Sequence, residues 1–264
     1  MLIFIFIFIF IFIFIFIFIV IFTFASFLKA GHSVFFGERT LEVPAVKESQ
    51  AAIVVPILVL AALWIPLYPE AFVDFYYQAH TLGFTHLITL GWITMIIMGA
   101  GYQLVQVALE TRLWSERLGR WQYWLMLAGV AGMIPHFWLG HWEGMADAAV
   151  LVGISGLLFI VNIALSLRSV PVWNIVAWHV SAALVFFAGT LTLGVLMALD
   201  KLWNFFPGDV LSILHAHAHL AGVGWVTMMI FGVAYKLIPM FTISPIEGGR
   251  AGMVGFWLLG GGVA

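Results

Sequence analysis

Two histidines, His86 and His219, each begin one copy of a repeated apolar pattern. The twenty residues that start at His86 align without a gap with the twenty that start at His219, and ten positions are identical. The identities include His, Gly, Trp, Thr and Tyr, which is more than shared hydrophobicity would give. Because an ionisable side chain inside a membrane is costly, a histidine that occurs twice in one such setting is a functional candidate.

A histidine triplet leads into the second copy, with His215, His217 and His219 separated by single alanines. At about 100° per residue, His215 and His219 share one face of a helix, and His217 points about 200° away from them. One helix could therefore serve two centres. The intervening alanines leave the approach open to a flat macrocycle or a metal ion.

Three chemistries could use neutral imidazoles in lipid. Haem b ranks first, because a bis-histidine iron takes one imidazole from each of two helices and needs an apolar slot. Copper or zinc ranks second, since it would need about three convergent histidines. Candidate metal ligands are His86, His136, His215, His217 and His219. A proton or ion pathway ranks third, because the acidic residues lie only at the ends of the predicted spans.

Other histidines have simpler explanations. His80 and His141 are expected at the ends of predicted spans, where a histidine is more often an interfacial residue than a ligand. His136 and His179 are as well suited to an interhelical hydrogen bond as to a ligand role.

The composition defines the class of protein. Of the 264 residues, 64% are apolar and 8% are charged, and the mean hydropathy is +1.14. A soluble domain of this length could not cover itself with so few charges. There is no cysteine, so disulfides, Fe–S clusters and thiolate metal sites are excluded. A net charge of −2 gives no basic surface for nucleic acid.

We therefore predict an all-α, polytopic transmembrane helix bundle with seven complete spans, a truncated eighth and a parallel internal helix repeat. The predicted spans are 2–28, 51–68, 78–109, 121–142, 146–167, 174–199 and 211–241, and the eighth begins near Gly252. Residues 1–28 form a low-complexity Ile-Phe segment, 29–50 a polar loop, and 51–264 the haem-binding bundle. The final Gly-rich apolar stretch suggests a piece of a longer protein.

Loop charges predict the orientation, because Lys and Arg collect on the cytoplasmic side. The loops of one side contain Arg112, Arg117, Arg120, Arg168 and Arg250. Spans 78–109 and 211–241 would then both run inward, which makes the repeat parallel. His86 and His219 would both lie roughly 12 Å below the outer end. This common depth favours His86 and His219 as a haem pair, with His217 as the alternative partner or as the ligand of a second centre.

The motifs around these histidines resemble those of a known family. They are His86 with Leu90-Gly91-Trp92, the stretch Met98–Val105, the triplet His215–His219, and the stretch Gly232–Pro239. Together they are similar to the haem-copper oxidase subunit I superfamily, with cbb3-type oxidases and nitric oxide reductases as the nearest members. The resemblance implies that His86 binds haem. It also implies that His217-Ala-His219 matches an element whose two histidines serve two haems on opposite helix faces.

The resemblance has clear departures. Catalytic subunits of the family have more spans than are predicted here, and the adjacent His-His copper pair and the His-Pro-Glu-Val-Tyr motif are absent from this sequence. Haem binding is therefore the stronger expectation, and terminal reduction of O2 or NO would belong to a full-length protein.

The expected function is electron transfer by a membrane haem protein in a prokaryotic inner membrane. A cytochrome c-type or quinol electron donor would be its partner. The alternatives are a non-enzymatic haem- or copper-binding sensor or NO-response protein, and a transporter built on parallel repeats.

Overall fold

A computed structural model describes residues 63–64, 66–69, 75–244 and 249–263. The Ile-Phe segment 1–28, the loop 29–50 and most of the predicted span 51–68 lie outside these residues. Within the described ranges the chain is helical and contains no strand, so the predicted all-α class is confirmed.

Two long helices contain the repeated pattern, and each has a π-helical middle. The first consists of α3 (Ala79–His86), η2 (Leu87–Thr94) and α4 (Met95–Ala108). The second consists of α8 (Val210–His219), η3 (Leu220–Thr227) and α9 (Met228–Thr242). The other helices are α5 (Glu116–Leu139), α6 (Trp142–Leu167), α7 (Ile175–Trp203) and α10 (Arg250–Val263).

Four stretches of helix in the described residues are long and apolar enough to cross a membrane. They are Ala79–Gln103, Trp142–Leu167, Ile175–Trp203 and Val210–Met240. At a rise of about 1.5 Å per residue, each exceeds the roughly 30 Å of a hydrocarbon core. They correspond to four of the predicted spans. The chain therefore has the helices of a multi-pass membrane protein.

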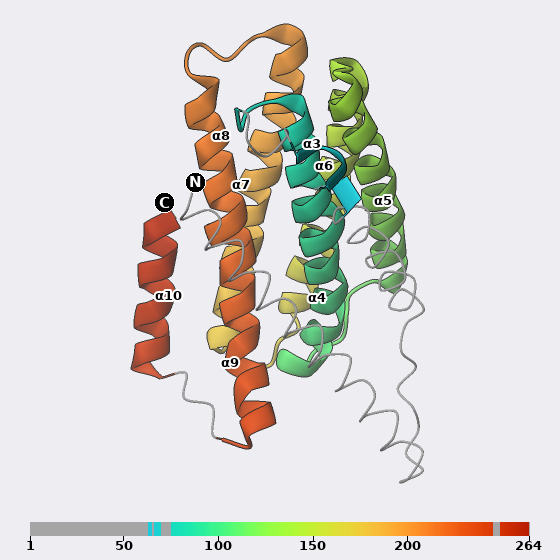
Figure 1. Ribbon diagram of the computed structural model, residues 1–264. Coiled ribbons are helices and arrows are strands. Elements are labelled where there is room, and N and C mark those ends of the chain that lie inside the picture. The colour runs from blue at the N-terminus through green and yellow to red at the C-terminus, as the bar shows by residue number, and fades with distance from the viewer. Residues whose placement is uncertain (1–62, 65, 70–74, 245–248, 264) are drawn as a thin grey trace. The chain divides into compact units, whose positions relative to one another are not determined.

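Neighbouring helices pack in chain order from α5 to α7, and α7 then packs on α8, η3 and α9. The helix of α3 and α4 packs on α5 through α3 and on α6 and α9 through α4. In Figure 1, α3 to α4 and α8 to α9 both run from the top of the view to the bottom, whereas α5 runs upward. The two helices that carry the repeat therefore have the same direction.

The π-helical segments occupy the same place in both copies of the repeat. Each is eight residues long and begins directly after a histidine, at Leu87 after His86 and at Leu220 after His219. Within η3, the Thr227 hydroxyl donates to the carbonyl of Gly222, five residues earlier, at 2.8 Å. π-Helical turns are rare and are frequent at functional sites.

Buried hydrogen bonds hold α4, α5 and α6 together. Gln122 Nε2 donates to Ser155 Oγ at 3.1 Å, and Tyr102 Oη donates to Gln122 Oε1 at 3.2 Å. Asn162 pairs with the backbone of Ser115, accepting from its N–H at 3.0 Å and donating to its carbonyl at 2.9 Å. Gln122, Ser155 and Asn162 are almost fully buried. Since each side chain is partnered, this group explains helix packing without requiring a ligand.

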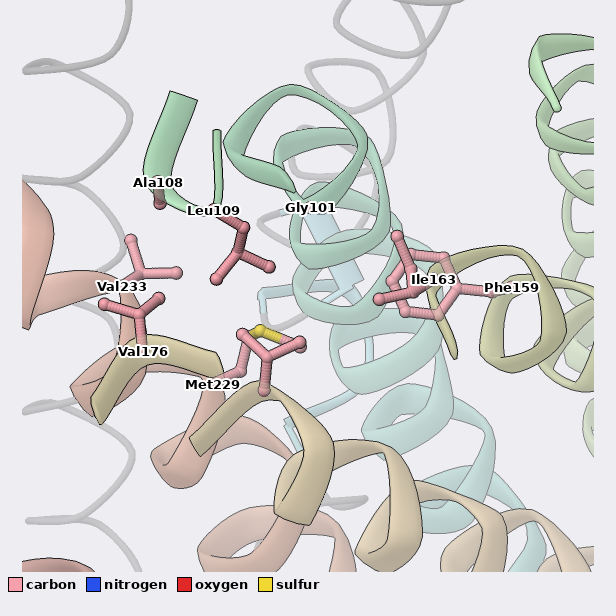
Figure 2. Close-up of a pocket in the computed structure, with 9 residues that line it drawn as sticks. Gly101, Ala108, Leu109, Phe159, Ile163, Val176, Met229 and Val233 are labelled. Atoms are coloured by element: carbon pink, nitrogen blue, oxygen red, sulfur yellow. The ribbon is translucent and has the colours of Figure 1, made fainter. Parts of the chain in front are cut away.

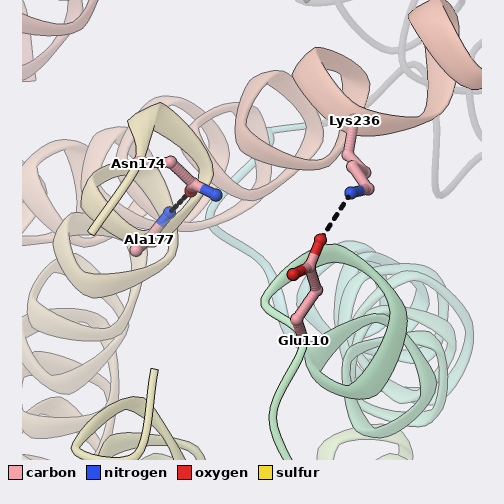
Figure 3. Close-up of polar contacts among 4 residues, drawn as sticks. All are labelled: Glu110, Asn174, Ala177 and Lys236. Atoms are coloured by element: carbon pink, nitrogen blue, oxygen red, sulfur yellow. Dashed lines mark hydrogen bonds and ion pairs between the residues drawn. The ribbon is translucent and has the colours of Figure 1, made fainter. Parts of the chain in front are cut away.

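Polar contacts also fix the helix ends at one end of the bundle (Figure 3). Asn174 caps α7 by accepting from the N–H of Ala177 at 3.0 Å. Glu110, just after α4, pairs with Lys236 of α9 at 3.4 Å. This ion pair links the residues just after α4 to α9.

The interface between α5 and α6 depends on Gly129. A Cβ atom at this position would lie 2.7 Å from Val152 Cγ2 and 3.0 Å from the Val152 backbone nitrogen. The Val152 backbone cannot shift unless the rest of α6 moves with it. We therefore expect Gly129→Ala to lower the free energy of unfolding by about 1–3 kcal/mol. Thermal unfolding in detergent measures this effect. Ala128→Val is the matched control, since Ala128 is exposed, and an equal loss in both variants would contradict the packing.

Candidate functional site

His86 and His217 lie close to each other between α3 and α8, with nearly parallel ring planes. Their ring centroids are 6.5 Å apart, and the two ring planes differ by 22°. Both side chains are half-buried. The structure thus brings together two of the predicted ligands, one from each helix of the repeat.

Hydrogen bonds fix the tautomer of both rings. His86 Nδ1 lies 2.7 Å from the carbonyl oxygen of Leu82, and His217 Nδ1 lies 3.0 Å from that of Thr190. A carbonyl only accepts, so each Nδ1 must carry the hydrogen, and each Nε2 has a free lone pair. Neither Nε2 makes a hydrogen bond with another described residue. A backbone carbonyl can orient a metal-binding histidine in this way, although His136 and His179 make the same kind of contact.

Other helices position the two rings. Phe137 of α5 stacks on His86 with ring centroids 5.2 Å apart, and Gly83 allows this approach, because a Cβ there would lie 3.2 Å from Phe137 Cβ. On α7, a Cβ at Gly194 would lie 3.0 Å from His217 Cε1. The pair therefore has neighbours on α3, α5, α7 and α8.

The separation of the two ring centroids is close to that of two imidazoles that bind one metal ion from opposite sides. With metal–nitrogen bonds of about 2.0 Å, the two ring centroids would lie roughly 6 Å apart, close to the observed 6.5 Å. In the part of the chain that the structure describes, no group of three His, Cys, Asp or Glu residues could hold a metal ion. The donor set therefore fits a bis-imidazole haem better than a copper site of three histidines.

His219, the favoured partner of His86 in the sequence, faces another helix. Its Nε2 lies 3.1 Å from the carbonyl oxygen of Gly262 in α10, so that nitrogen carries the hydrogen. His217 takes the place beside His86 because it points about 200° away from His219 around the helix axis. The alternative pairing of His86 with His217 is thus the one that this geometry favours.

His215 and His136 lie apart from the pair. The His215 ring stacks on Tyr76 with centroids 6.1 Å apart, and its Nε2 is 3.5 Å from Tyr76 Oη. His136 Nδ1 is 2.6 Å from the carbonyl oxygen of Gly132, and its ring lies 5.2 Å from that of His141. His141 Nδ1 accepts from the N–H of Gly144 at the start of α6. His141 therefore acts as a helix cap.

His80 and His179 also pack against neighbouring rings. The His80 ring meets Trp138 edge to face at 4.5 Å. His179 is buried near the start of α7, where Nδ1 is 2.8 Å from the Ile175 carbonyl oxygen and the ring contacts Tyr235 and Phe256. These contacts account for both residues as packing residues.

A small cavity lies between α4, α6, α7 and α9 (Figure 2). Its lining is entirely apolar and consists of Gly101, Ala108, Leu109, Phe159, Ile163, Val176, Val180, Met229 and Val233. At about 10 Å³ it could hold at most one water, and it offers that water no hydrogen bond. This cavity is a packing defect rather than a cofactor site.

Three residues beside the pair, Thr190, Phe137 and Gly194, were not predicted as site residues. Thr190 acts through its backbone carbonyl, which any residue could supply, so it has no sequence signal. Phe137 lies in an ordinary apolar stretch. Gly194 is a small residue in the middle of a predicted span, which is the single available signal of a close approach.

Comparison of the sequence with protein-family models gave no match, and a search of curated proteins gave none either.

Proposed function

We propose that this chain is a membrane haem protein in which His86 and His217 would hold one haem b. The observation that carries the proposal is the pair of imidazoles with centroids 6.5 Å apart, in which both Nδ1 atoms are bound to carbonyls and both Nε2 lone pairs are free. Histidines from two helices of one bundle are a common way to hold a haem.

A haem b at this site supplies reversible one-electron chemistry. The carbonyls of Leu82 and Thr190 hold the two rings in the binding tautomer, and Phe137 shields His86 from water. A haem held by both imidazoles would carry electrons and would not bind a gas. Electron transfer is therefore the activity that we propose for this site, and reduction of O2 or NO would need a second centre.

The proposal also covers the electron donor, the membrane, the number of spans and the repeat. The resemblance to haem-copper oxidase subunit I supports a cytochrome c-type or quinol electron donor and a prokaryotic inner membrane. We also propose seven complete spans, an eighth that starts in α10, and a parallel repeat. The matching π-helical segments and the common direction of the two helices support the repeat (Figure 1).

Optical spectroscopy tests the proposal directly. The protein purified in detergent should show a sharp low-spin α-band in its reduced-minus-oxidised spectrum, with one haem b per chain by pyridine haemochrome assay. Carbon monoxide should leave the band unchanged, because His86 and His217 would both hold the iron. A protein that neither retains haem nor takes up added haemin would refute the proposal and favour the transporter.

A donor assay separates an electron carrier from a haem sensor. In stopped-flow mixing, a reduced quinol or a reduced c-type cytochrome should reduce the haem within the turnover time of a respiratory chain. A haem that only dithionite reduces would identify a sensor.

A further inference from the structure

One stripe of α5 faces outward along the whole helix. Its members are Arg117, Arg120, Trp121, Trp124, Ala128, Ala131, Pro135 and Leu139, and all of them are exposed. At about 100° per residue, these eight positions fall within an arc of about 100° on the helix surface. They therefore form one continuous surface, which we call the α5 stripe.

The chemistry of the α5 stripe changes along the helix axis. Two arginines come first, two tryptophans that are 61% and 57% exposed follow, and the rest is apolar. From Trp121 to Leu139 the helix rises roughly 27 Å, which is close to the roughly 30 Å of a hydrocarbon core. Tryptophan concentrates at the boundary between lipid and water. The helix α5 is not among the four stretches that are long and apolar enough to cross a membrane, but it contains most of the predicted span 121–142. In that span the two arginines would lie at the level of the lipid head groups.

The two arginines have no ionic partner within the described part of the chain. The ion pair found there joins Lys236 to Glu110, and neither Arg117 nor Arg120 takes part in one. Glu116 is the nearest acidic residue in sequence, and it lies outside the arc of the stripe. Guanidinium groups bind phosphate oxygens in a bidentate manner, so two unpaired guanidinium groups at head-group level are complementary to a phosphodiester.

We propose that the α5 stripe binds one anionic phospholipid. Arg117 and Arg120 bind its phosphate, Trp121 and Trp124 contact the glycerol and ester region, and an acyl chain lies along Ala128 to Leu139. A zwitterionic lipid binds less well, because its own ammonium group competes with the arginines for the phosphate. The apolar length of the stripe favours a lipid over a soluble anion or a water-soluble protein. This proposal does not depend on the haem site.

Native mass spectrometry of the detergent-purified protein tests the proposal. The probes are dioleoylphosphatidylglycerol and dioleoylphosphatidylcholine, titrated separately. Wild-type protein should bind phosphatidylglycerol more tightly than phosphatidylcholine. In Arg117→Gln/Arg120→Gln, the affinity for phosphatidylglycerol should fall on the order of tenfold, while that for phosphatidylcholine stays within about twofold.

The matched control removes the same charge elsewhere. Arg168→Gln/Arg250→Gln also lacks two arginines, both exposed and outside the α5 stripe, and should keep the wild-type preference. An equal loss in this control would show general charge attraction and overturn the proposal. So would a wild-type protein without the preference, or an α5 variant that retains it. If millimolar glycerol phosphate displaces the lipid, the two arginines bind a simple anion and the proposed lipid site is wrong.

Discussion

His86→Ala and His217→Ala should each abolish the low-spin haem spectrum, whereas His219→Ala should leave it intact. Each of the first two changes removes one of the two imidazoles of the pair, whose centroids are 6.5 Å apart. Removal of a haem ligand should lower haem retention by more than the roughly 10–100-fold that loss of a residue supporting a ligand typically costs. His219 instead contacts the carbonyl of Gly262, so its loss does not reach the pair. Pyridine haemochrome content and the reduced α-band measure the result.

The control is the folded state of each variant. Size-exclusion profiles and thermal unfolding should show that His86→Ala and His217→Ala remain folded when expressed without haem. His179→Ala is a further comparison, because His179 is a buried histidine outside the site. If His219→Ala loses the spectrum and His217→Ala keeps it, the pair is His86 with His219. If none of these variants affects haem content, His86 is a packing residue.

The all-α class was predictable from the sequence because few backbone structures other than helices are stable in lipid. A chain with 64% apolar residues must satisfy its backbone polar groups internally, and a helix does so within one segment. Four of the predicted spans therefore match stretches of helix that could cross a membrane. The same reasoning located the repeated histidines on two helices. It could not foresee the π-helical segments after His86 and His219, because no residue pattern specifies a five-residue hydrogen-bond register.

The sequence could not predict which histidine of the triplet lies beside His86. Alignment of the repeat matches His86 with His219, but the relevant quantities are the depth and the rotation of each helix. His86 is the eighth residue of α3, and His217 is the eighth residue of α8, whereas His219 is the tenth. The face that α8 turns toward α3 is set by its packing on α7. Contacts of this kind depend on side chains far away in the sequence.

Gly194→Val should lower the affinity of the protein for haem. A Cβ at Gly194 would lie 3.0 Å from His217 Cε1, so the larger side chain of Gly194→Val should push the imidazole away from Thr190 and from His86. We expect haem affinity to fall on the order of tenfold, with a shifted or broadened α-band from the residual haem. Haemin titration of the apoprotein and the reduced spectrum measure both effects.

Gly189→Val is the matched control for this prediction, because it adds the same side chain to the same helix. A Cβ at Gly189 would meet the end of the flexible Leu220 side chain at 3.3 Å and no histidine. It should therefore change stability by a similar amount and leave haem affinity near the wild-type value. If both variants lose haem equally, the effect belongs to α7 packing. If Gly194→Val binds haem normally, the His217 ring does not lie against α7 in the haem-bound protein, and its tautomer is not set by Thr190.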